Sequence, residues 1–305
     1  MKYWFHCFGL RVASDIDLCG RAASPGQPDL VLRVRRVRHH VAHVPAVQWG
    51  RDQARRLSWA ILPALARVEA HHSGEVLIEA AEDVDADSLR FIAVTVALPL
   101  ALHQRPGLVL EASAILWQGQ ALVIVGRGYC GKSTLAALMA DQGAELLADS
   151  HCLLTLSESG GLVLGPALPH IRLWPAQAQL LGPEWPAPVA LRPGLSKSVF
   201  VVPERFASDP EPVRGLIVLR RGVDSQSRQH RLPVRECLQA LAVAGSRLVT
   251  SVNPDQNALR FSIMTKLAAL PICHLLQWPR WGESELETRS TLLELLAGQD
   301  WGVSA

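Results

Sequence analysis

The chain has 305 residues and a mass of 33.2 kDa, which is long enough for about two domains and for a core that needs no disulfide or metal to hold it. Hydrophobic residues make up 49% and charged residues 19%, which excludes a disordered or fibrous protein. The 30 basic and 28 acidic residues give a formal charge of +2, and this balance argues against binding of nucleic acid or a membrane through bulk charge.

Lysine is rare in this chain. Only four of the 30 basic residues are lysines, namely Lys2, Lys132, Lys197 and Lys266. Lysine and arginine differ in shape, hydration and hydrogen-bond geometry, so each lysine is a position to inspect.

Cysteine spacing and the apolar runs indicate the cellular compartment of the protein. The six cysteines form no C-x-x-C pair, and the first residues lack the apolar run of a signal peptide. The apolar stretch 91–102 is shorter than the ~20 residues that a membrane span requires. We therefore expect a cytoplasmic protein with no membrane segment and no nucleic-acid partner.

Residues 1–105 are expected to form a smaller N-terminal α/β region that is either accessory or substrate-binding. Apolar and arginine residues partly alternate over 30–37, as in a half-buried strand. The leucine and isoleucine spacing over 57–65 predicts a helix, and a short strand is expected at 76–78. Residues 85–102 read as a second helix with acidic residues at its start.

A basic stretch overlaps the first of these strands and has two interpretations. It is either a surface that steers an acidic peptide or, as we favour, the solvated face of a strand. Two of its histidines have metal-compatible spacing only if the segment is helical. The stretch comprises Arg33, Arg35, Arg36, Arg38, His39, His40 and His43.

A breaker cluster at 103–107 is the expected boundary to a second region, residues 106–305. Two apolar runs follow, 108–117 and 121–125, joined as in a hairpin. Thereafter strands and helices alternate, which indicates an α/β domain. We expect further strands at 145–148, 199–202, 213–219 and 272–277, and helices at 134–141, 235–249, 254–270 and 284–296.

Residues 126–133 read Gly-Arg-Gly-Tyr-Cys-Gly-Lys-Ser, which matches G-x-x-x-x-G-K-[ST] without a mismatch. Glycines allow successive backbone N–H groups to turn toward phosphate oxygens, and the following helix N-terminus adds positive charge. Lys132 is expected to reach the β- and γ-phosphates of a nucleotide, and the Ser133 hydroxyl to ligate Mg²⁺. The alternative is a chance glycine turn, which the flanking strand and helix make rarer. The predicted nucleotide-binding residues are Gly126, Arg127, Gly128, Tyr129, Cys130, Gly131, Lys132, Ser133 and Thr134.

Asp149 ends the apolar run that follows the helix, which is where a strand delivers a carboxylate to a metal and phosphate site. A strand-terminal aspartate is also a common turn former or helix cap. Because it follows the loop and helix directly, Asp149 is predicted to be functional.

With these motifs the sequence resembles the HPr serine kinase family, and more closely its relatives in peptide-modification clusters, including the lasso-peptide kinases. The matching pieces are Phe8-Gly9-Leu10, Ser14-Asp15, Leu110–Ala114, GRGYCGKSTLA and Glu145–Asp149, with weaker matches at Ile171–Trp174 and Lys197. The resemblance implies an α/β protein whose residues 106–305 form a P-loop HPr-kinase/PEP-carboxykinase-like domain. It also implies a kinase that uses ATP and Mg²⁺ to phosphorylate a Ser hydroxyl on a peptide or small protein, such as a lasso-type precursor. In such a kinase Asp149 would serve as a base or as a second Mg²⁺ ligand beside Ser133.

Two departures from the family pattern bear on catalysis. The family's histidine before the loop is Glu111 here, and its second aspartate after the helix is Ser150. A carboxylate can replace imidazole as a proton acceptor, so Glu111 joins Asp149 and Lys132 as predicted catalytic residues. The same changes leave open a nucleotide-binding sensor or scaffold with altered catalysis. A nucleotidyl or small-molecule phosphotransferase is a further alternative.

Arg172 and Lys197 are predicted to contact phosphate or substrate, because charge-assisted hydrogen bonds stabilise transferring oxygens. The alternative for both is a solvated surface position. The acceptor's identity and the formation of a homo-oligomer stay open at this stage.

Overall fold

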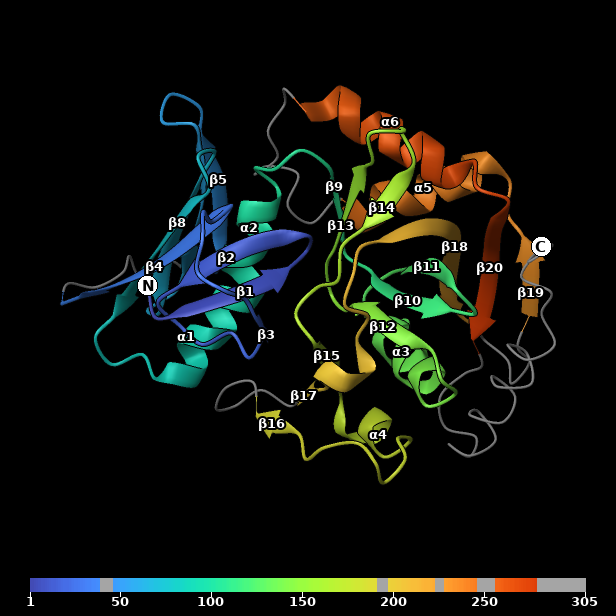
Figure 1. Cartoon of the computed structure of the whole chain (residues 1–305), viewed down its shortest axis with the longest axis horizontal. Coiled ribbons are helices and arrows are strands. Elements are labelled where there is room, and N and C mark those ends of the chain that lie inside the picture. Colours follow the sequence, from blue (N-terminus) through green and yellow to red (C-terminus); the bar gives the residue numbers. More distant parts are fainter. Residues whose placement is uncertain (39–45, 191–196, 223–227, 246–255, 279–305) are drawn as a thin grey trace.

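The computed structural model describes residues 1–38, 46–190, 197–222, 228–245 and 256–278, and over these ranges the chain is a mixed α/β protein with three sheets (Figure 1). Elements of the N-terminal region lie at the left of the view and the sheet that begins at residue 108 lies at the right.

The N-terminal region is built on an eight-stranded sheet with the order β3-β1-β2-β4-β8-β7-β6-β5. Most neighbours in it are antiparallel, whereas β4 runs parallel to both β2 and β8. The strands are β1 (Tyr3–Cys7), β2 (Leu10–Ser14), β3 (Arg21–Ala22), β4 (Leu30–Val37), β5 (Gln48–Asp52), β6 (Leu57–Leu62), β7 (Ala66–His71) and β8 (Glu75–Ala81).

The helix predicted over 57–65 is wrong, because this segment forms strand β6 and the turn into β7. Ser58, Ala60 and Leu62 are buried while Trp59 and Ile61 are less so, which is the side-chain alternation of a strand. Pro63 and the left-handed Ala64 (φ 56°) then reverse the chain. An apolar spacing compatible with a helix is thus overridden by a hairpin.

The helical segment expected over 85–102 is confirmed, as α1 (Ala86–Ile92), a π-helical stretch η1 (Ala93–Ala97) and α2 (Leu98–Leu102). Asp85 caps its start by accepting a 2.7 Å hydrogen bond from the Ser88 N–H. The segment packs on β6, β7 and β8, and its apolar residues join the core of the N-terminal sheet.

The second sheet has nine strands, with the main path β12-β10-β11-β18-β14-β13-β9 and with β20 joining β18 to β19. The β10–β11 hairpin is confirmed, but the run 108–117 is broken at Glu111 and Ala112 into β9 and β10, which pair with different strands. The strands are β9 (Leu108–Leu110), β10 (Ser113–Trp117), β11 (Gln120–Val125), β12 (Glu145–Ala148), β13 (Cys152–Leu156), β14 (Leu162–Leu164), β18 (Glu211–Arg221), β19 (Arg228–Arg231) and β20 (Ile272–Trp278).

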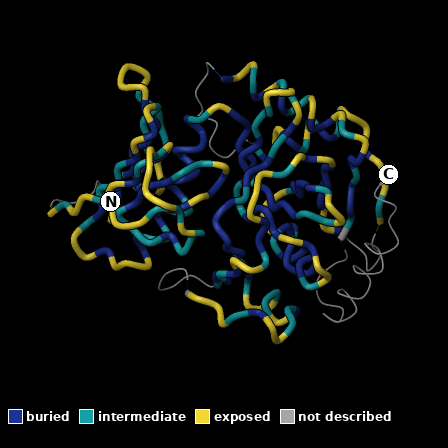
Figure 2. Tube along the Cα trace, viewed as in Figure 1, coloured by how far each residue is buried: buried dark blue, intermediate teal, exposed yellow. Residues whose placement is uncertain are grey.

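Helices cover both faces of this sheet, with α3 (Lys132–Ala140) on one face and α5 (Val234–Gly245) and α6 (Asn257–Ala268) on the other (Figure 1). The alternation of β11 explains the arrangement: Leu122 and Ile124 pack in the cluster with α3, whereas Val123 and Val125 pack in the cluster with α5 and α6. Figure 2 shows the buried positions concentrated in the sheets and the exposed ones at the loops.

A third, small sheet has the order β15-β17-β16 and lies beside α3. Its strands and neighbours are β15 (His170–Leu173), α4 (Pro175–Ala178), β16 (Val189–Ala190), β17 (Ser198–Val201) and the 3-10 turn η2 (Pro203–Arg205). The ends of two predicted helices, at 246–249 and 254–255, and all of the one at 284–296 lie outside the described residues.

Residues 103–107 connect α2 to β9, where the boundary between 1–105 and 106–305 is predicted. One apolar cluster includes Ile78 on one side of this connection and Leu110 on the other. The two regions therefore share packed core. In the described residues, no helix is long and apolar enough to cross a membrane.

Candidate functional site

The 126–133 loop connects β11 to α3, and glycines shape it. A Cβ on Gly126 would lie 2.4 Å from the Leu219 carbonyl oxygen and 2.7 Å from Cys130 Sγ, closer than real contacts allow. Gly131, at φ 105°, lies immediately before the first turn of α3. The loop therefore turns its main chain closely against β18 before the helix begins.

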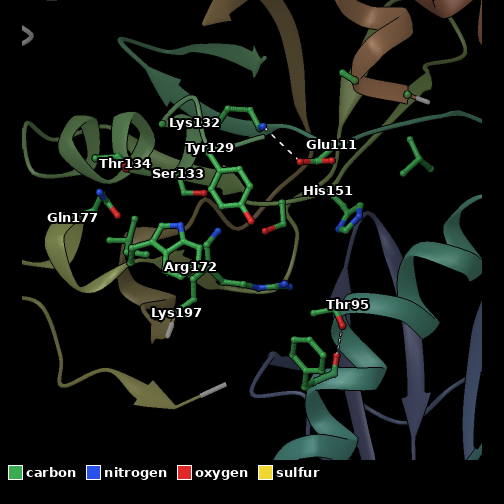
Figure 3. Close-up of a pocket in the computed structure, with 18 of the residues that line it drawn as sticks. Thr95, Glu111, Tyr129, Lys132, Ser133, Thr134, His151, Arg172, Gln177 and Lys197 are labelled. Carbon is green, nitrogen blue, oxygen red and sulfur yellow. Dashed lines mark hydrogen bonds and ion pairs between the residues drawn. The ribbon is translucent and has the colours of Figure 1, made fainter. Parts of the chain in front are cut away.

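Lys132 is the first residue of α3, and its side chain is only 9% exposed. Its Nζ donates to the carbonyl oxygens of Gly126 at 3.0 Å and Arg127 at 3.4 Å. The same ammonium lies 3.7 Å from Glu111 Oε1 (Figure 3). Glu111 reaches it because the break between β9 and β10 places the carboxylate beside the loop.

A cavity of about 880 Å³ opens in front of the loop. Eight of the predicted site residues line it together: Glu111, Tyr129, Gly131, Lys132, Ser133, Thr134, Arg172 and Lys197. The other loop residues, Gly126, Arg127, Gly128 and Cys130, are not among its lining residues. Burial raises the pKa of the Cys130 thiol, and the positive charge of Lys132 opposes that rise.

Asp149 lies next to the main cavity and lines a small cavity that shares His151 and Arg172 with it. The residue is 9% exposed. Its carboxylate accepts hydrogen bonds from Ser113 Oγ at 2.7 Å, the Arg172 N–H at 3.1 Å and Ser150 Oγ at 3.3 Å. The carboxylate thus ties β10 and β15 together.

Four basic side chains from the second region line the cavity and form what we call its basic wall, namely Lys132, Arg172, Lys197 and Arg221. Burial lowers the pKa of Arg172, an effect that Asp149 opposes. Burial also lowers the pKa of Lys197, and Asp149 again opposes it while Arg172 adds to it. Positive groups that are partly stripped of water and crowd one another favour a polyanion as their partner.

Two aromatic rings border this basic wall. Tyr129 is 74% exposed and stacks on Trp174, with ring centroids 6.0 Å apart and an interplanar angle of 26°. Lys197 Nζ lies 5.4 Å from the Trp174 ring centroid, within cation–π range. The Trp174 ring therefore helps to place the Lys197 ammonium.

Sequence reasoning missed several residues that line the cavity. Trp49, Phe91, Thr95 and His103 come from the N-terminal region, and no local pattern signals that they approach the loop. His151 and Arg221 also line it, and so does Trp174, which belongs to the weaker family match at 171–174 but was not predicted as a site residue. The position of His151 two residues after Asp149 is a signal that could have indicated it.

The arginines of the basic stretch, on and just after β4, pair across the sheet with acidic residues on and just after β8. Arg33 contacts Glu75 at 3.1 Å, Arg38 contacts Glu82 at 3.1 Å, and Arg35 pairs with Glu79. This pairing fits the solvated strand face, since three of the four arginines are matched by carboxylates and Arg36 donates to the carbonyl oxygens of Ala81 and Val84. The histidines at 39, 40 and 43 lie outside the described residues.

Among the described residues, no group of three or more His, Cys, Asp or Glu side chains could hold a metal ion by itself. The donors expected for Mg²⁺ are of the right chemical type: the Ser133 hydroxyl lines the cavity, and the Asp149 carboxylate lies next to it. Mg²⁺ commonly takes one or two protein oxygens and completes its shell with phosphates and water. The residues fit an ion carried in with a nucleotide.

No family model and no curated protein matches this chain. One solved structure to which it is similar is the Hpr(Ser) kinase/phosphatase from Coxiella burnetii. The match has 14% identity, covers 63% of this chain and 99% of that chain, and has a TM-score of 0.29. Such a low TM-score does not establish a common fold.

Proposed function

We propose that this protein is an ATP- and Mg²⁺-dependent kinase that transfers the γ-phosphoryl group to a Ser hydroxyl of a peptide or small protein, on an HPr-kinase-like P-loop scaffold. The observation that carries the proposal is the glycine-shaped loop between β11 and α3, whose Lys132 and Ser133 line one cavity with Glu111, Arg172 and Lys197. A loop of this sequence in front of a helix binds phosphates. A lasso-type precursor peptide is the acceptor that the sequence resemblance favours.

Phosphate oxygens would replace Glu111 as the partner of Lys132, whose ammonium is already held beside the loop carbonyls. Arg172 and Lys197 would neutralise charge that develops on the transferring group. Mg²⁺, bound by Ser133 and the phosphates with Asp149 near, would supply further charge neutralisation. The basic wall suits a triphosphate because partly desolvated cations gain most from a multivalent anion.

In the transfer itself, the acceptor oxygen bonds to the γ-phosphorus and the bond to the β–γ bridging oxygen breaks, so that ADP leaves. The proton of the acceptor hydroxyl passes to the Glu111 carboxylate. Glu111 is assigned this role because its side chain faces the cavity and is 24% exposed. Asp149 acts as a positioning residue, because its oxygens already accept three hydrogen bonds from the protein.

Incubation with γ-labelled or α-labelled ATP and candidate peptides tests the proposal. Label transferred only from the γ position supports a kinase, whereas label from the α position supports nucleotidyl transfer. Lys132→Ala is expected to lose nearly all transfer and to weaken ATP binding by about 100-fold or more, as loss of a charged phosphate contact requires. Lys266→Ala, on α6 and outside the cavity lining, is the matched control. Full transfer by Lys132→Ala would refute the proposal.

A nucleotide-binding sensor or scaffold without transferase activity is the second candidate. The observation that favours it is the engagement of Asp149 by Ser113, Ser150 and the Arg172 main chain, which leaves this carboxylate few free lone pairs. Tight ATP binding with no label transferred to any peptide would support this candidate instead of the kinase.

A further inference from the structure

The cavity in front of the loop is walled by two distant parts of the chain. Lys132, Ser133 and Arg172 come from the second region, whereas Trp49 of β5, Phe91 of α1 and Thr95 of η1 come from the first. Figure 3 shows Thr95 across the cavity from the Lys132–Glu111 pair, with His151 between them. The side chains of the N-terminal region therefore face the phosphate loop across a shared space.

The two walls differ in chemistry. The basic groups belong to the loop side, and Glu111 and His151 lie where the two walls approach each other. The N-terminal wall carries two aromatic rings, a Thr hydroxyl and His103, and burial lowers the pKa of His103 to about 4, so that its ring is neutral at physiological pH. A wall without net charge offers nothing to a triphosphate, but it suits an uncharged segment with apolar side chains.

The helix that forms the N-terminal wall is irregular at this place. Thr95 lies within the π-helical stretch 93–97, and its Oγ1 donates a 2.7 Å hydrogen bond to the Phe91 carbonyl oxygen. Single π-helical turns inside α-helices are uncommon and occur often at functional sites. Phe91 and Thr95, one turn apart, both face the cavity.

We propose that this N-terminal wall, formed by Trp49, Phe91 and Thr95, is the acceptor subsite, and that it selects peptides with a large apolar side chain next to the phosphorylated Ser. The inference rests on the proposed kinase function and deepens it. The acceptor must approach the γ-phosphate from the side opposite the leaving ADP. With the triphosphate on the basic wall, the space toward Thr95 and Phe91 receives the acceptor, and its Ser hydroxyl comes to Glu111.

A degenerate peptide library with one fixed central Ser and γ-labelled ATP tests this subsite. The native protein is expected to prefer an aromatic or large aliphatic residue within two positions of the Ser. Phe91→Ala is expected to lower kcat/KM for the selected peptide by about 10- to 100-fold, which is the usual effect of removing hydrophobic contacts from a specificity pocket. Its Kd for ATP should be unchanged.

Thr95→Trp guards against a folding artefact, because it fills the subsite instead of emptying it. The tryptophan variant should lose peptide phosphorylation while it still binds ATP. Phe261→Ala, on α6 with Phe261 63% exposed, is the control for loss of a phenylalanine elsewhere.

The outcomes separate the two levels of the proposal. A native protein that phosphorylates peptides without any apolar preference, or folded Phe91→Ala and Thr95→Trp variants with native kcat/KM, would overturn the subsite alone. A native protein that transfers no label to any peptide would overturn the kinase function and the subsite with it.

Discussion

Replacing Asp149 by alanine should destabilise the fold, because the buried carboxylate accepts three hydrogen bonds that join β10 to β15. The Ser113 and Ser150 hydroxyls can rotate toward other acceptors, but the Arg172 N–H cannot. An unsatisfied buried N–H costs about 1–3 kcal/mol, and loss of a hydrogen bond to a charged acceptor costs about 1.5–3 kcal/mol. Because both costs include the lost hydrogen bond from the Arg172 N–H, they do not add in full, and we expect a loss of about 2–4 kcal/mol in the free energy of unfolding.

Asp149→Asn is the discriminating variant. Its amide oxygen can still accept from the Arg172 N–H, and its NH₂ can donate to the Ser113 hydroxyl, so the loss should be only about 1 kcal/mol. Because Asp149 is a positioning residue, the Asp149→Asn variant should phosphorylate peptides about tenfold more slowly than the native protein. Glu111→Gln, which removes the proton acceptor, should cost about 100-fold.

Urea unfolding gives the stabilities and γ-phosphoryl transfer gives the activities. Asp209→Ala, at an exposed position, is the control and should lie within about 0.5 kcal/mol of the native protein. The reasoning is refuted if Asp149→Ala is as stable as this control, or if Asp149→Asn is as unstable as Asp149→Ala. Activity of Asp149→Asn as low as that of Lys132→Ala would instead give Asp149 a direct part in transfer.

Two further predictions follow from the loop and from the buried histidines. Gly126→Ala should lower stability by about 1–3 kcal/mol and weaken ATP binding, because the new Cβ would overlap the Leu219 carbonyl oxygen; thermal unfolding and calorimetry measure both. The control is Gly119→Ala, because a Cβ at Gly119 would meet no atom within 4 Å, and this variant should bind ATP normally. Equal ATP affinities for the Gly126→Ala and Gly119→Ala variants would contradict the steric account. Burial lowers the pKa of His103 and of His170 to about 4 from the usual 6.5, so the unfolded chain binds more protons between these values. The free energy of unfolding should therefore fall as the pH drops from 6.5 toward 4, by at most about 3 kcal/mol per histidine. His170→Asn should reduce the slope of the unfolding free energy against pH in this range. An unchanged slope in this variant would contradict the assignment of the pH dependence to His170.

Much of the secondary structure could be predicted from the sequence because its signals are local. The β10–β11 hairpin, α3 and the Asp85-capped helix each depend on a few consecutive residues. The segment 57–65 was mispredicted because its apolar spacing fits a helix as well as a strand that turns at Pro63. Pairing with β5 and β7, which are neighbours in space, decided between the two.

The candidate site divides in the same way. The eight residues 126–133 determine by themselves a glycine-shaped loop with a lysine at the start of a helix, since sterics and hydrogen bonding act within one turn of chain. Only the tertiary structure decided that Glu111 lies 3.7 Å from Lys132, because this depends on the break between β9 and β10. Only the tertiary structure brought Phe91 and Thr95 to the opposite wall of the cavity, because packing between the two regions, and no sequence pattern, places these side chains opposite the loop.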